Sequence, residues 1–309
     1  MNDQAIDVSI LIVSYNTRDM TVECIESIFD QTTEHTFEVI VIDNDSSDGS
    51  AEAIRKQCPQ VTVIESGENL GFARANNEAS KVACGSRILL LNPDTVILDK
   101  AIDKLLDFAG ENPDNRMWGG RHVFRDGSKN TYNCWSDYTL WSVFCSCTAL
   151  SKFFSHSNLF NPRPYPKYDR MSVKEVDIIT GCYLLIDADL WIELEGFDPD
   201  YFLFAEEADL CVRARMKGAR PLLTPDSRII HDGGGSAPIK SEDRRIQLLK
   251  AERQYHRKHF GPMGARVACL LIDMRVTLLA LVGTLQYLLT GRRNPRASMA
   301  LLRRRREWA

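Results

Sequence analysis

The chain has 309 residues, of which 44% are apolar, so it can bury one large α/β core with an appendage or two smaller cores. The formal net charge of −4 shows no basic excess, which argues against a protein that binds nucleic acid. The charge is uneven, because residues 292–309 hold seven arginines and one acid, and this predicts a tail with its own partner.

The nine cysteines are scattered along the chain. Cys145 and Cys147 form the only close pair in the sequence, and they lack the second pair that a zinc site of this spacing needs. Residues 1–4 show no basic stretch leading into an apolar run, so we expect no secretory signal. These features predict a reduced, cytoplasmic chain.

The first third of the chain alternates strands and helices. Apolar, β-branched runs at residues 8–14 and 37–43 predict strands buried on both faces, and a helix begins after Thr17 between them. The alternation continues with a helix over residues 47–57, a strand over 61–65, a helix over 72–83 and a strand over 87–92. This order predicts a doubly wound sheet.

The rhythm changes after Asp94. Asp99 can cap a helix that reaches residue 109, and residues 117–124 with the turn after them predict antiparallel strands. Residues 133–170 are rich in proline and aromatic residues, which favours a loop or flap. A strand segment over 177–186 and helices over 189–195, 206–217 and 241–259 follow.

Polar residues follow each of the four early strands, at the edge where a doubly wound sheet binds ligands. They are Ser14, Tyr15 and Asn16, then Asp43, Asn44 and Asp45, then Asn69, Gly71 and Phe72, and finally Asn92 and Asp94. One acid after a strand is most often a turn former or a helix cap. Polar clusters at all four ends predict a binding site instead.

At these segments the sequence resembles the family 2 glycosyltransferases, and within them the bacterial rhamnosyltransferase-like enzymes. The resemblance rests on VSYN (13–16), VIDNDSSDGS (41–50), NLGFA (69–73), LLNPDT (90–95), GFD (196–198), EEADL (206–210) and HDGGGS (231–236). The segments stand in the family's order. The resemblance implies an α/β fold of the GT-A type, a nucleotide-sugar donor and inversion at the anomeric carbon.

The resemblance also implies a divalent ion, Mg²⁺ or Mn²⁺, held by Asp94. Such an ion offsets the charge that develops on a leaving sugar diphosphate, and hard oxygen ligands suit it. The family's usual Asp-x-Asp reads Asn92-Pro93-Asp94 here, so one acid is missing and Asn92 becomes a donor contact. His231 is the candidate for the vacant ligand position, although a lone histidine is as often structural.

The donor site is expected to include Asp43, whose carboxylate would accept the N3–H of uracil or thymine without telling them apart. The alternative for Asp43 is a helix cap, although residues 45–47 are better placed for that. Arg74, Asn76 and Asn77 are candidates for contacts with the diphosphate or the base, the alternative for Arg74 being a solvated helix charge. The expected donor site also takes in Ser14, Tyr15, Asn16, Asn44, Gly71 and Phe72.

Glu206 and Glu207 are the predicted catalytic acids. An inverting transfer needs one carboxylate to take the acceptor's proton, and the resemblance assigns this role to Glu207, where the family usually has aspartate. A misplacement of about 1 Å can cost ~10²-fold in rate. The alternative is that both acids only stabilise a helix N-terminus. Asp209 is expected to pair with Arg213, and an acceptor contact is its further candidate role.

Residues 265–290 are mostly apolar but are interrupted by Asp273, Arg275 and Gln286, so the continuous run is shorter than the ~20 residues of a spanning helix. We expect residues 1–262 to be the catalytic domain and residues 263–309 to be an interfacial helix or hairpin. Its arginine tail would meet anionic lipid on the cytoplasmic face of the membrane. The alternative is a helix packed on the catalytic domain with a disordered basic end.

We therefore expect a peripheral enzyme that moves a sugar to a glycan or lipid-linked glycan in cell-surface polysaccharide synthesis. dTDP-L-rhamnose is the favoured donor and a UDP-sugar the second. A nicotinamide oxidoreductase and a nucleotidylyltransferase both require a glycine-rich turn that the first strand lacks. A catalytically weak nucleotide-sugar-binding protein stays open because of Asn92 and Glu207, and so does the oligomeric state, a homo-oligomer included.

Overall fold

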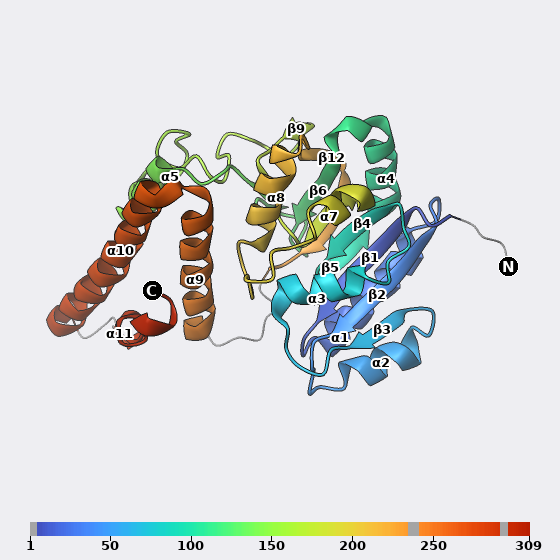
Figure 1. Cartoon of the computed structure of the whole chain (residues 1–309), viewed down its shortest axis with the longest axis horizontal. Coiled ribbons are helices and arrows are strands. Elements are labelled where there is room, and N and C mark those ends of the chain that lie inside the picture. Colours follow the sequence, from blue (N-terminus) through green and yellow to red (C-terminus); the bar gives the residue numbers. More distant parts are fainter. Residues whose placement is uncertain (1–4, 234–240, 291–295) are drawn as a thin grey trace. The chain divides into compact units, whose positions relative to one another are not determined.

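A computed structural model describes residues 5–233, 241–290 and 296–309 (Figure 1). The chain divides into two compact units. The first comprises Met1–Trp135, Tyr168–Phe202 and Glu206–Pro238, and the second comprises Ser136–Lys167, Leu203–Ala205 and Ile239–Ala309. The expected boundary between residues 262 and 263 remains a prediction about where the catalytic part ends, and residues 241–259 fall in the second unit.

The first unit is built on one large sheet. Its strands are β1 (Val8–Ser14), β2 (Phe37–Asp43), β3 (Thr62–Glu65), β4 (Arg87–Leu91), β5 (Thr95–Leu98), β6 (Met117–Val123), β11 (Tyr183–Asp187) and β12 (Leu222–His231), in the order β3-β2-β1-β4-β11-β6-β12-β5. Two short strands join it, β7 (Lys129–Asn130) on β6 and β9 (Lys174–Glu175) on β12. A separate pair is formed by β8 (Cys134–Trp135) and β10 (Ile178–Ile179).

The sheet is parallel in one half and mixed in the other. Strands β1 to β4 pair in parallel, as the alternation of strands and helices predicts. Strand β11 then runs antiparallel to both β4 and β6, and β12 runs parallel to β6 but antiparallel to β5. The expected antiparallel hairpin after residue 117 is present as β6 and β7. The doubly wound description therefore holds for the first four strands.

Helices cover the sheet on both faces, which is why β1 is buried along its whole length. They are α1 (Arg18–Gln31), α2 (Ser50–Gln57), α3 (Gly71–Ser80), α4 (Ala101–Glu111), α7 (Ala188–Glu193) and α8 (Glu206–Met216). Ile10 and Ile12 of β1 share a core with Ile25 of α1 and Leu105 of α4. Helix α3 packs against β1 and β2. Each helix lies within a few residues of its expected position.

Helix α2 begins at Ser50, later than the expected residue 47. The Asp48 carboxylate accepts hydrogen bonds from the backbone N–H (3.0 Å) and the hydroxyl of Ser50, and Gly49 adopts a left-handed conformation with φ of +80°. Asp48 therefore satisfies an N–H of the first turn, a role expected of residues 45–47.

The second unit is helical, and residues 133–170 are not simply a loop. They include α5 (Leu140–Cys147) and α6 (Leu150–Phe153), so the expectation of a loop or flap is wrong for this part. Thr139 and Ser142 form reciprocal cap hydrogen bonds at the start of α5. Val143 of α5 is buried with residues of the longer helices, and the prolines at 162, 164 and 166 lie beyond the ends of α5 and α6.

Three further helices complete this unit, α9 (Ser241–His259), α10 (Gly261–Thr290) and α11 (Arg296–Arg303). Helix α10 is continuous, so residues 265–290 form a helix and not a hairpin. Among the described residues, it is the one helix that is long and apolar enough to cross a membrane, judged by length and composition. Such a helix by itself is weak support for a membrane location.

The charges that interrupt the apolar run of α10 are paired inside the unit. Asp273 accepts hydrogen bonds from Arg253 (2.8 Å) and Arg305 (2.7 Å), and Arg275 donates to Glu252 (2.9 Å). The opposite side of α10 shows an exposed apolar stripe with steps of three or four residues. The stripe consists of Val267, Leu270, Met274, Leu278, Leu281, Leu285 and Leu288. Leu279 and Tyr287, which lie on other sides of the helix, are also exposed, so towards its C-terminal end α10 presents apolar side chains around its circumference.

The arginine-rich end is partly folded into this unit. Arg304 forms ion pairs with Asp243 (2.6 Å) and Glu307 (2.7 Å), and Trp308 is buried against Leu301 and Ile272. The alternative of a disordered basic end does not describe residues 296–309, whose last arginines partly neutralise acids of the same unit.

Candidate active site

The strand ends bring the predicted site residues to one edge of the sheet. Asp43 closes β2 and lies opposite Ser14 of β1, and Asp94 follows β4, which is parallel to β1. His231 reaches the same region from a distant part of the sequence, because β12 pairs with β5 and places His231 opposite Thr95. Sheet register therefore makes neighbours of Asp94 and His231.

Asp94 and His231 form a buried polar pair at this edge. The Nε2 atom of His231 lies 3.5 Å from Oδ1 of Asp94, and both side chains are almost fully buried. Burial lowers the pKa of His231, but the nearby Cys182 and Asp94 outweigh it and raise that pKa to about 11. A positive charge next to Asp94 is therefore favoured at neutral pH.

The same two atoms fit a divalent ion. Ligand atoms at ~2.0–2.2 Å from one ion are separated by about 3 Å, and the observed 3.5 Å requires only a small adjustment. The Nδ1 atom of His231 is buried and has no hydrogen-bond partner within the described part of the chain. A carboxylate oxygen and an imidazole nitrogen are both suitable ligands for Mn²⁺.

Asp43 presents an unsatisfied acceptor. Its Oδ2 accepts a hydrogen bond from the backbone N–H of Ser46 (3.1 Å), whereas the buried Oδ1 has no hydrogen-bond partner among residues 5–233, 241–290 and 296–309. A buried acceptor without a donor costs free energy. A hydrogen bond from a ligand N–H to Oδ1 removes this cost and therefore contributes more to binding than a hydrogen bond at an exposed position.

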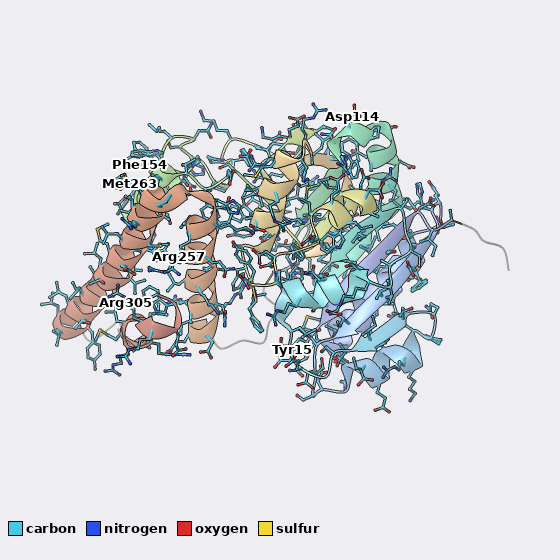
Figure 2. The ribbon with its side chains drawn as sticks, viewed as in Figure 1. Tyr15, Asp114, Phe154, Arg257, Met263 and Arg305 are labelled. Atoms are coloured by element: carbon cyan, nitrogen blue, oxygen red, sulfur yellow. The ribbon has the colours of Figure 1, made fainter. Side chains whose placement is uncertain are left out.

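Several other predicted donor residues hold the loops of the site in place. The Ser14 hydroxyl shares a buried network with Thr17 (3.2 Å) and Thr21 (3.1 Å). Asn16 Oδ1 accepts from the backbone N–H of Ser47 (2.8 Å). These bonds fix the loop that follows β1 against the loop that follows β2. Tyr15 lies half-buried in the first of these loops (Figure 2).

Asn44 and Gly71 connect the second loop to α3. The Asn44 side chain donates to the Gly71 carbonyl (3.2 Å) and accepts from the Leu70 N–H (2.8 Å). Gly71 has φ of +77°, and a Cβ at this position would lie 2.3 Å from the carbonyl oxygen of Phe202. Phe72 donates its N–H to that same oxygen (2.8 Å). Glycine is therefore required here both for backbone conformation and for close approach.

The polar residues of α3 are engaged with the segment around residue 198. Arg74 Nε donates to the Pro199 carbonyl (3.1 Å), and Asn77 both donates to and accepts from the backbone of Phe197. Asn76 is buried and donates to the Phe72 carbonyl (2.9 Å). Their expected role in donor binding is a prediction, and the contacts described here are structural.

Glu206 and Glu207 begin α8, and the two residues before them have a strained backbone conformation. Phe204 and Ala205 are consecutive non-glycine residues with φ of +73° and +65°, a conformation that costs on the order of 1–3 kcal/mol for each residue and is concentrated at functional sites. Glu206 is buried, and this burial, with the neighbouring charge of Glu207, raises the pKa of Glu206 well above its usual value. Glu207 is half-buried beside Gly181.

Asp209 pairs with Arg213, as the i, i+4 spacing predicts. The Arg213 Nε donates to the fully buried Asp209 carboxylate (2.7 Å), and its two other nitrogens donate to the carbonyls of Leu194 and Gly196. The pair therefore ties α8 to the end of α7. The acceptor contact considered for Asp209 stays a prediction.

The comparison with protein families decides the identity of this site. The model for "Glycosyl transferase family 2" matches residues 9–194, which is more than half of the chain. The chain belongs to glycosyl transferase family 2.

Named relatives of this glycosyltransferase include two rhamnosyltransferases. "Rhamnosyltransferase WbbL" of Escherichia coli (strain K12) is 28% identical over 235 residues, covering 72% of this chain and 83% of the relative. The "N-acetylglucosaminyl-diphospho-decaprenol L-rhamnosyltransferase" of Mycobacterium tuberculosis is 26% identical over 218 residues, covering 64% and 67%. The resemblance of the sequence to the rhamnosyltransferase-like enzymes is therefore confirmed.

Solved structures confirm the GT-A fold of this glycosyltransferase. The mannosyltransferase PcManGT from Pyrobaculum calidifontis, in complex with GDP-Man and Mn²⁺, aligns with a TM-score of 0.56 at 19% identity, over 99% of this chain and 85% of that one. TarS of S. aureus, in complex with UDP, aligns with a TM-score of 0.51 at 15% identity, over 94% and 74%.

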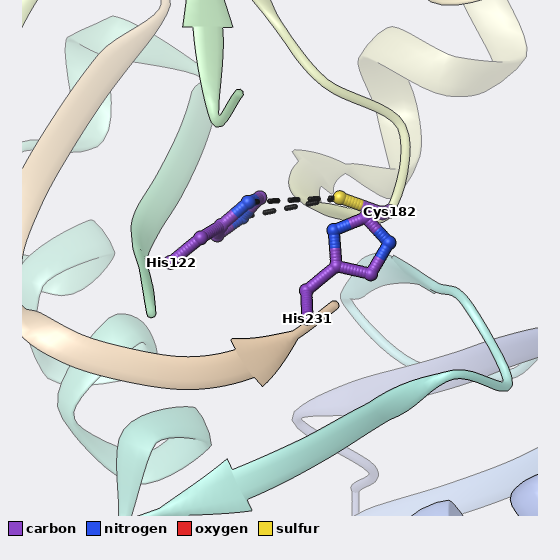
Figure 3. A group of neighbouring side chains, drawn as sticks. All are labelled: His122, Cys182 and His231. Atoms are coloured by element: carbon purple, nitrogen blue, oxygen red, sulfur yellow. Dashed lines mark hydrogen bonds between the residues drawn. The ribbon is translucent and has the colours of Figure 1, made fainter. Parts of the chain in front are cut away.

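Two residues of the glycosyltransferase site were not singled out from the sequence. His122 of β6 and Cys182, just before β11, lie next to His231 (Figure 3). Neither belongs to a motif with recognisable spacing, because each comes from a different strand. Asn92, the residue in place of the first acid, donates its backbone N–H to the Cys182 carbonyl (3.1 Å).

Proposed function

We propose that this family 2 glycosyltransferase moves a sugar, with rhamnose favoured, from a nucleotide-diphosphate donor to a glycan or lipid-linked glycan, with inversion, in cell-surface polysaccharide synthesis. The observation that carries the proposal is the meeting of Asp43, with its unsatisfied oxygen, and the Asp94–His231 pair at one edge of the sheet. The names of the two rhamnosyltransferase relatives support rhamnose. A UDP-sugar is the second candidate donor, since a solved structure of the same fold contains UDP.

Asp94 and His231 are the residues that would hold a divalent ion, Mg²⁺ or Mn²⁺. When bound, the ion stabilises the negative charge that develops on the diphosphate leaving group. The presence of Mn²⁺ with a nucleotide-sugar in a mannosyltransferase of the same fold supports this assignment. In the absence of the ion, the protonated His231 balances the charge of Asp94.

Asp43 is the residue that would read the base. Its free Oδ1 would accept the N3–H that uracil and thymine share, while the bond from Ser46 holds the carboxylate in place. This arrangement selects both bases over those that lack an N–H at the corresponding position.

Glu207 is the base we assign to the transfer. Because Glu206 is buried and its pKa is raised, Glu206 keeps its proton to higher pH, and the more accessible Glu207 is left as the ionised carboxylate. Glu207 would take the proton of the attacking acceptor hydroxyl, and Glu206 would orient it.

The second unit is proposed to bind the cytoplasmic face of the membrane. Helix α10 exposes many apolar side chains and carries Asp273 and Arg275 within its apolar run, which favours a helix lying in the interface over one that spans. A peripheral location suits a lipid-linked acceptor, such as the one in the name of the mycobacterial relative. The remaining arginines near the C-terminus would add attraction to anionic lipid.

Thermal unfolding with a panel of nucleotide-sugars tests the donor site. We expect dTDP-L-rhamnose or a UDP-sugar to raise the unfolding temperature in Mn²⁺ and to do so less in EDTA. Asp94→Asn should abolish the difference between Mn²⁺ and EDTA, whereas the exposed Asp226→Asn on the same strand as His231 should keep it. Stabilisation by no nucleotide diphosphate would contradict the proposal.

Transfer is then measured with the stabilising donor and a lipid-linked glycan acceptor. Formation of the opposite anomer in the product, determined by NMR, is expected for inversion. Retention of configuration would reject Glu207 as a base acting directly on the acceptor.

A further inference from the structure

We propose that His122, Cys182 and His231 form a three-ligand binding site for a thiophilic divalent metal, of which Zn²⁺ is the representative. The nitrogen and sulfur atoms of the three residues lie within 4.8 Å of one another, and all three side chains are buried. Figure 3 shows the Cys182 sulfur beside the His122 ring, with dashed lines to it, and next to the His231 ring. The metal site is independent of the proposed function. Only its consequence, competition with the catalytic ion, rests on that function.

The distances are those of ligands that are nearly in place. The Cys182 sulfur lies 3.9 Å from the ring nitrogens of His122, and the rings of His122 and His231 are 5.6 Å apart in an edge-on arrangement. Asp94 Oδ1 lies 3.5 Å from His231 Nε2. Ligands of one zinc ion, at ~2.0–2.1 Å for nitrogen and ~2.3 Å for sulfur, are separated by about 3.3–3.8 Å. A small closing movement is sufficient.

The sheet places His122 and His231 on the adjoining strands β6 and β12, and Cys182 directly precedes β11, which pairs with β6. His122 lies on β6 in register with Ile229 of β12, and His231 ends β12. The Cys182 carbonyl accepts the N–H of Asn92, which places the residue beside the segment that carries Asp94. The Asn130 side chain donates to the His231 carbonyl (2.7 Å). Ligands fixed by a sheet lose little conformational entropy when a metal binds.

The chemistry of the set distinguishes it from the catalytic ion's site. Two imidazoles and a thiolate, with water in the fourth position, suit tetrahedral Zn²⁺ or Co²⁺, whereas Mg²⁺ prefers oxygen ligands in an octahedron. Binding releases to solvent both the thiol proton of Cys182 and the imidazolium proton of His231. Because His231 belongs to both sites, occupancy by Zn²⁺ excludes Mn²⁺, and the transferase is inhibited by zinc.

Cobalt absorption of the full chain, prepared metal-free and without donor, tests the site directly. We expect the wild type to show a thiolate-to-cobalt charge-transfer band together with the intense visible bands of tetrahedral Co²⁺. Cys182→Ser should remove the charge-transfer band, whereas Cys84→Ser, at an exposed cysteine outside the cluster, should retain it. Absence of the band in the wild type, or its persistence in Cys182→Ser, would overturn the proposal.

A second variant protects the test against misfolding. If circular dichroism shows that Cys182→Ser is unfolded, His122→Gln carries the decision, and we expect it to weaken cobalt binding by roughly 10–100-fold. Unchanged affinity in a folded His122→Gln protein would count against the site.

Competition between the ions is followed by the electron paramagnetic resonance signal of free Mn²⁺. Adding Zn²⁺ to the wild type with Mn²⁺ should release Mn²⁺, and His122→Gln should raise the zinc concentration required at least about 10-fold. If cobalt binds but no nucleotide-sugar stabilises the chain, the donor proposal fails and the zinc site stands. If donors bind but no thiolate band forms, the zinc site fails and the donor proposal stands.

Discussion

Glu206 and Glu207 show how two neighbouring acids receive different environments from one helix start. Glu206 points into the protein, and its raised pKa follows first from burial and then from the charge of Glu207. The sequence showed an acidic pair with two possible roles, catalysis or stabilisation of a helix N-terminus. It did not show which acid is buried, because burial depends on how α8 packs after the strained residues at 204 and 205.

Glu207→Gln should leave donor binding intact and lower transfer by about 10²–10⁴-fold, because the amide cannot accept the acceptor's proton. Glu207→Asp restores the residue type usual in the family and should retain substantial transfer. The measurement is initial transfer rate beside donor-induced thermal stabilisation. Full activity of a folded Glu207→Gln enzyme would show that another group is the base.

Gly71 lets helix α3 begin directly against the Phe202 carbonyl, because it has no Cβ. Gly71→Ala should destabilise the first unit by about 1–3 kcal/mol through backbone strain, with a further loss from the clash at 2.3 Å. Gly67→Ala is the matched control, since Gly67 has a similar φ of +73° and no atom within 4 Å of its Cβ position. Equal losses of stability in urea unfolding would show that the contact with Phe202 is unimportant.

Helix α9 carries a buried histidine whose titration is expected to weaken the second unit in acid. Burial first, and then the charges of Arg163, Arg275 and His259, lower the pKa of His256 from 6.5 to about 4. Below pH 6.5 the unfolded chain takes up a proton that the folded chain refuses, so stability falls between pH 6.5 and about 4. The maximum loss is about 3 kcal/mol.

Thermal unfolding of His256→Gln as a function of pH tests this expectation. The variant should show a weaker pH dependence than the wild type in that window, because the side chain no longer titrates. His156→Gln, at an exposed histidine of the same unit, should behave as the wild type. Identical pH profiles for wild type and His256→Gln would refute the assignment.

At the scale of elements, the sequence located nearly every strand and helix of the first unit. Buried β-branched runs and helical spacing are local signals, and they persist in the fold because each element buries the face that the pattern marks. The helices within residues 140–153 were not predicted. Helix α5 depends on the Thr139 cap and on burial against α9 and α10, contacts that no local pattern reveals.

In the whole molecule, the exposed apolar side chains of α10 are expected to confer binding to lipid vesicles. Leu281→Glu combined with Leu285→Glu places two charges in the middle of the exposed stripe and should reduce co-sedimentation with anionic vesicles by at least about 10-fold. Ile192→Glu is the control, since Ile192 is equally exposed but belongs to the first unit. Equal binding of the double variant and wild type would remove α10 as the membrane contact.

The two units also differ in how much of their structure could be predicted from the sequence. Ordered motifs between residues 8 and 236 predicted the GT-A fold and the family, both of which are confirmed. The segment from 265 to 290 read as an interrupted apolar run, because a linear reading cannot show that Asp273 and Arg275 turn toward Arg253 and Glu252. These charges are paired within the unit, while apolar side chains of the same helix, such as Leu281 and Leu285, stay exposed.

The sequence alone determined the family, the GT-A fold and the residues Asp43, Asp94, Glu207 and His231 as candidates, because motifs and apolar periodicity are properties of neighbours along the chain. The tertiary structure decided which of these groups meet. Sheet register placed His231 beside Asp94 and added His122 and Cys182, which no spacing connects. Contacts across a sheet depend on strand order, and strand order is set by the packing of the whole unit.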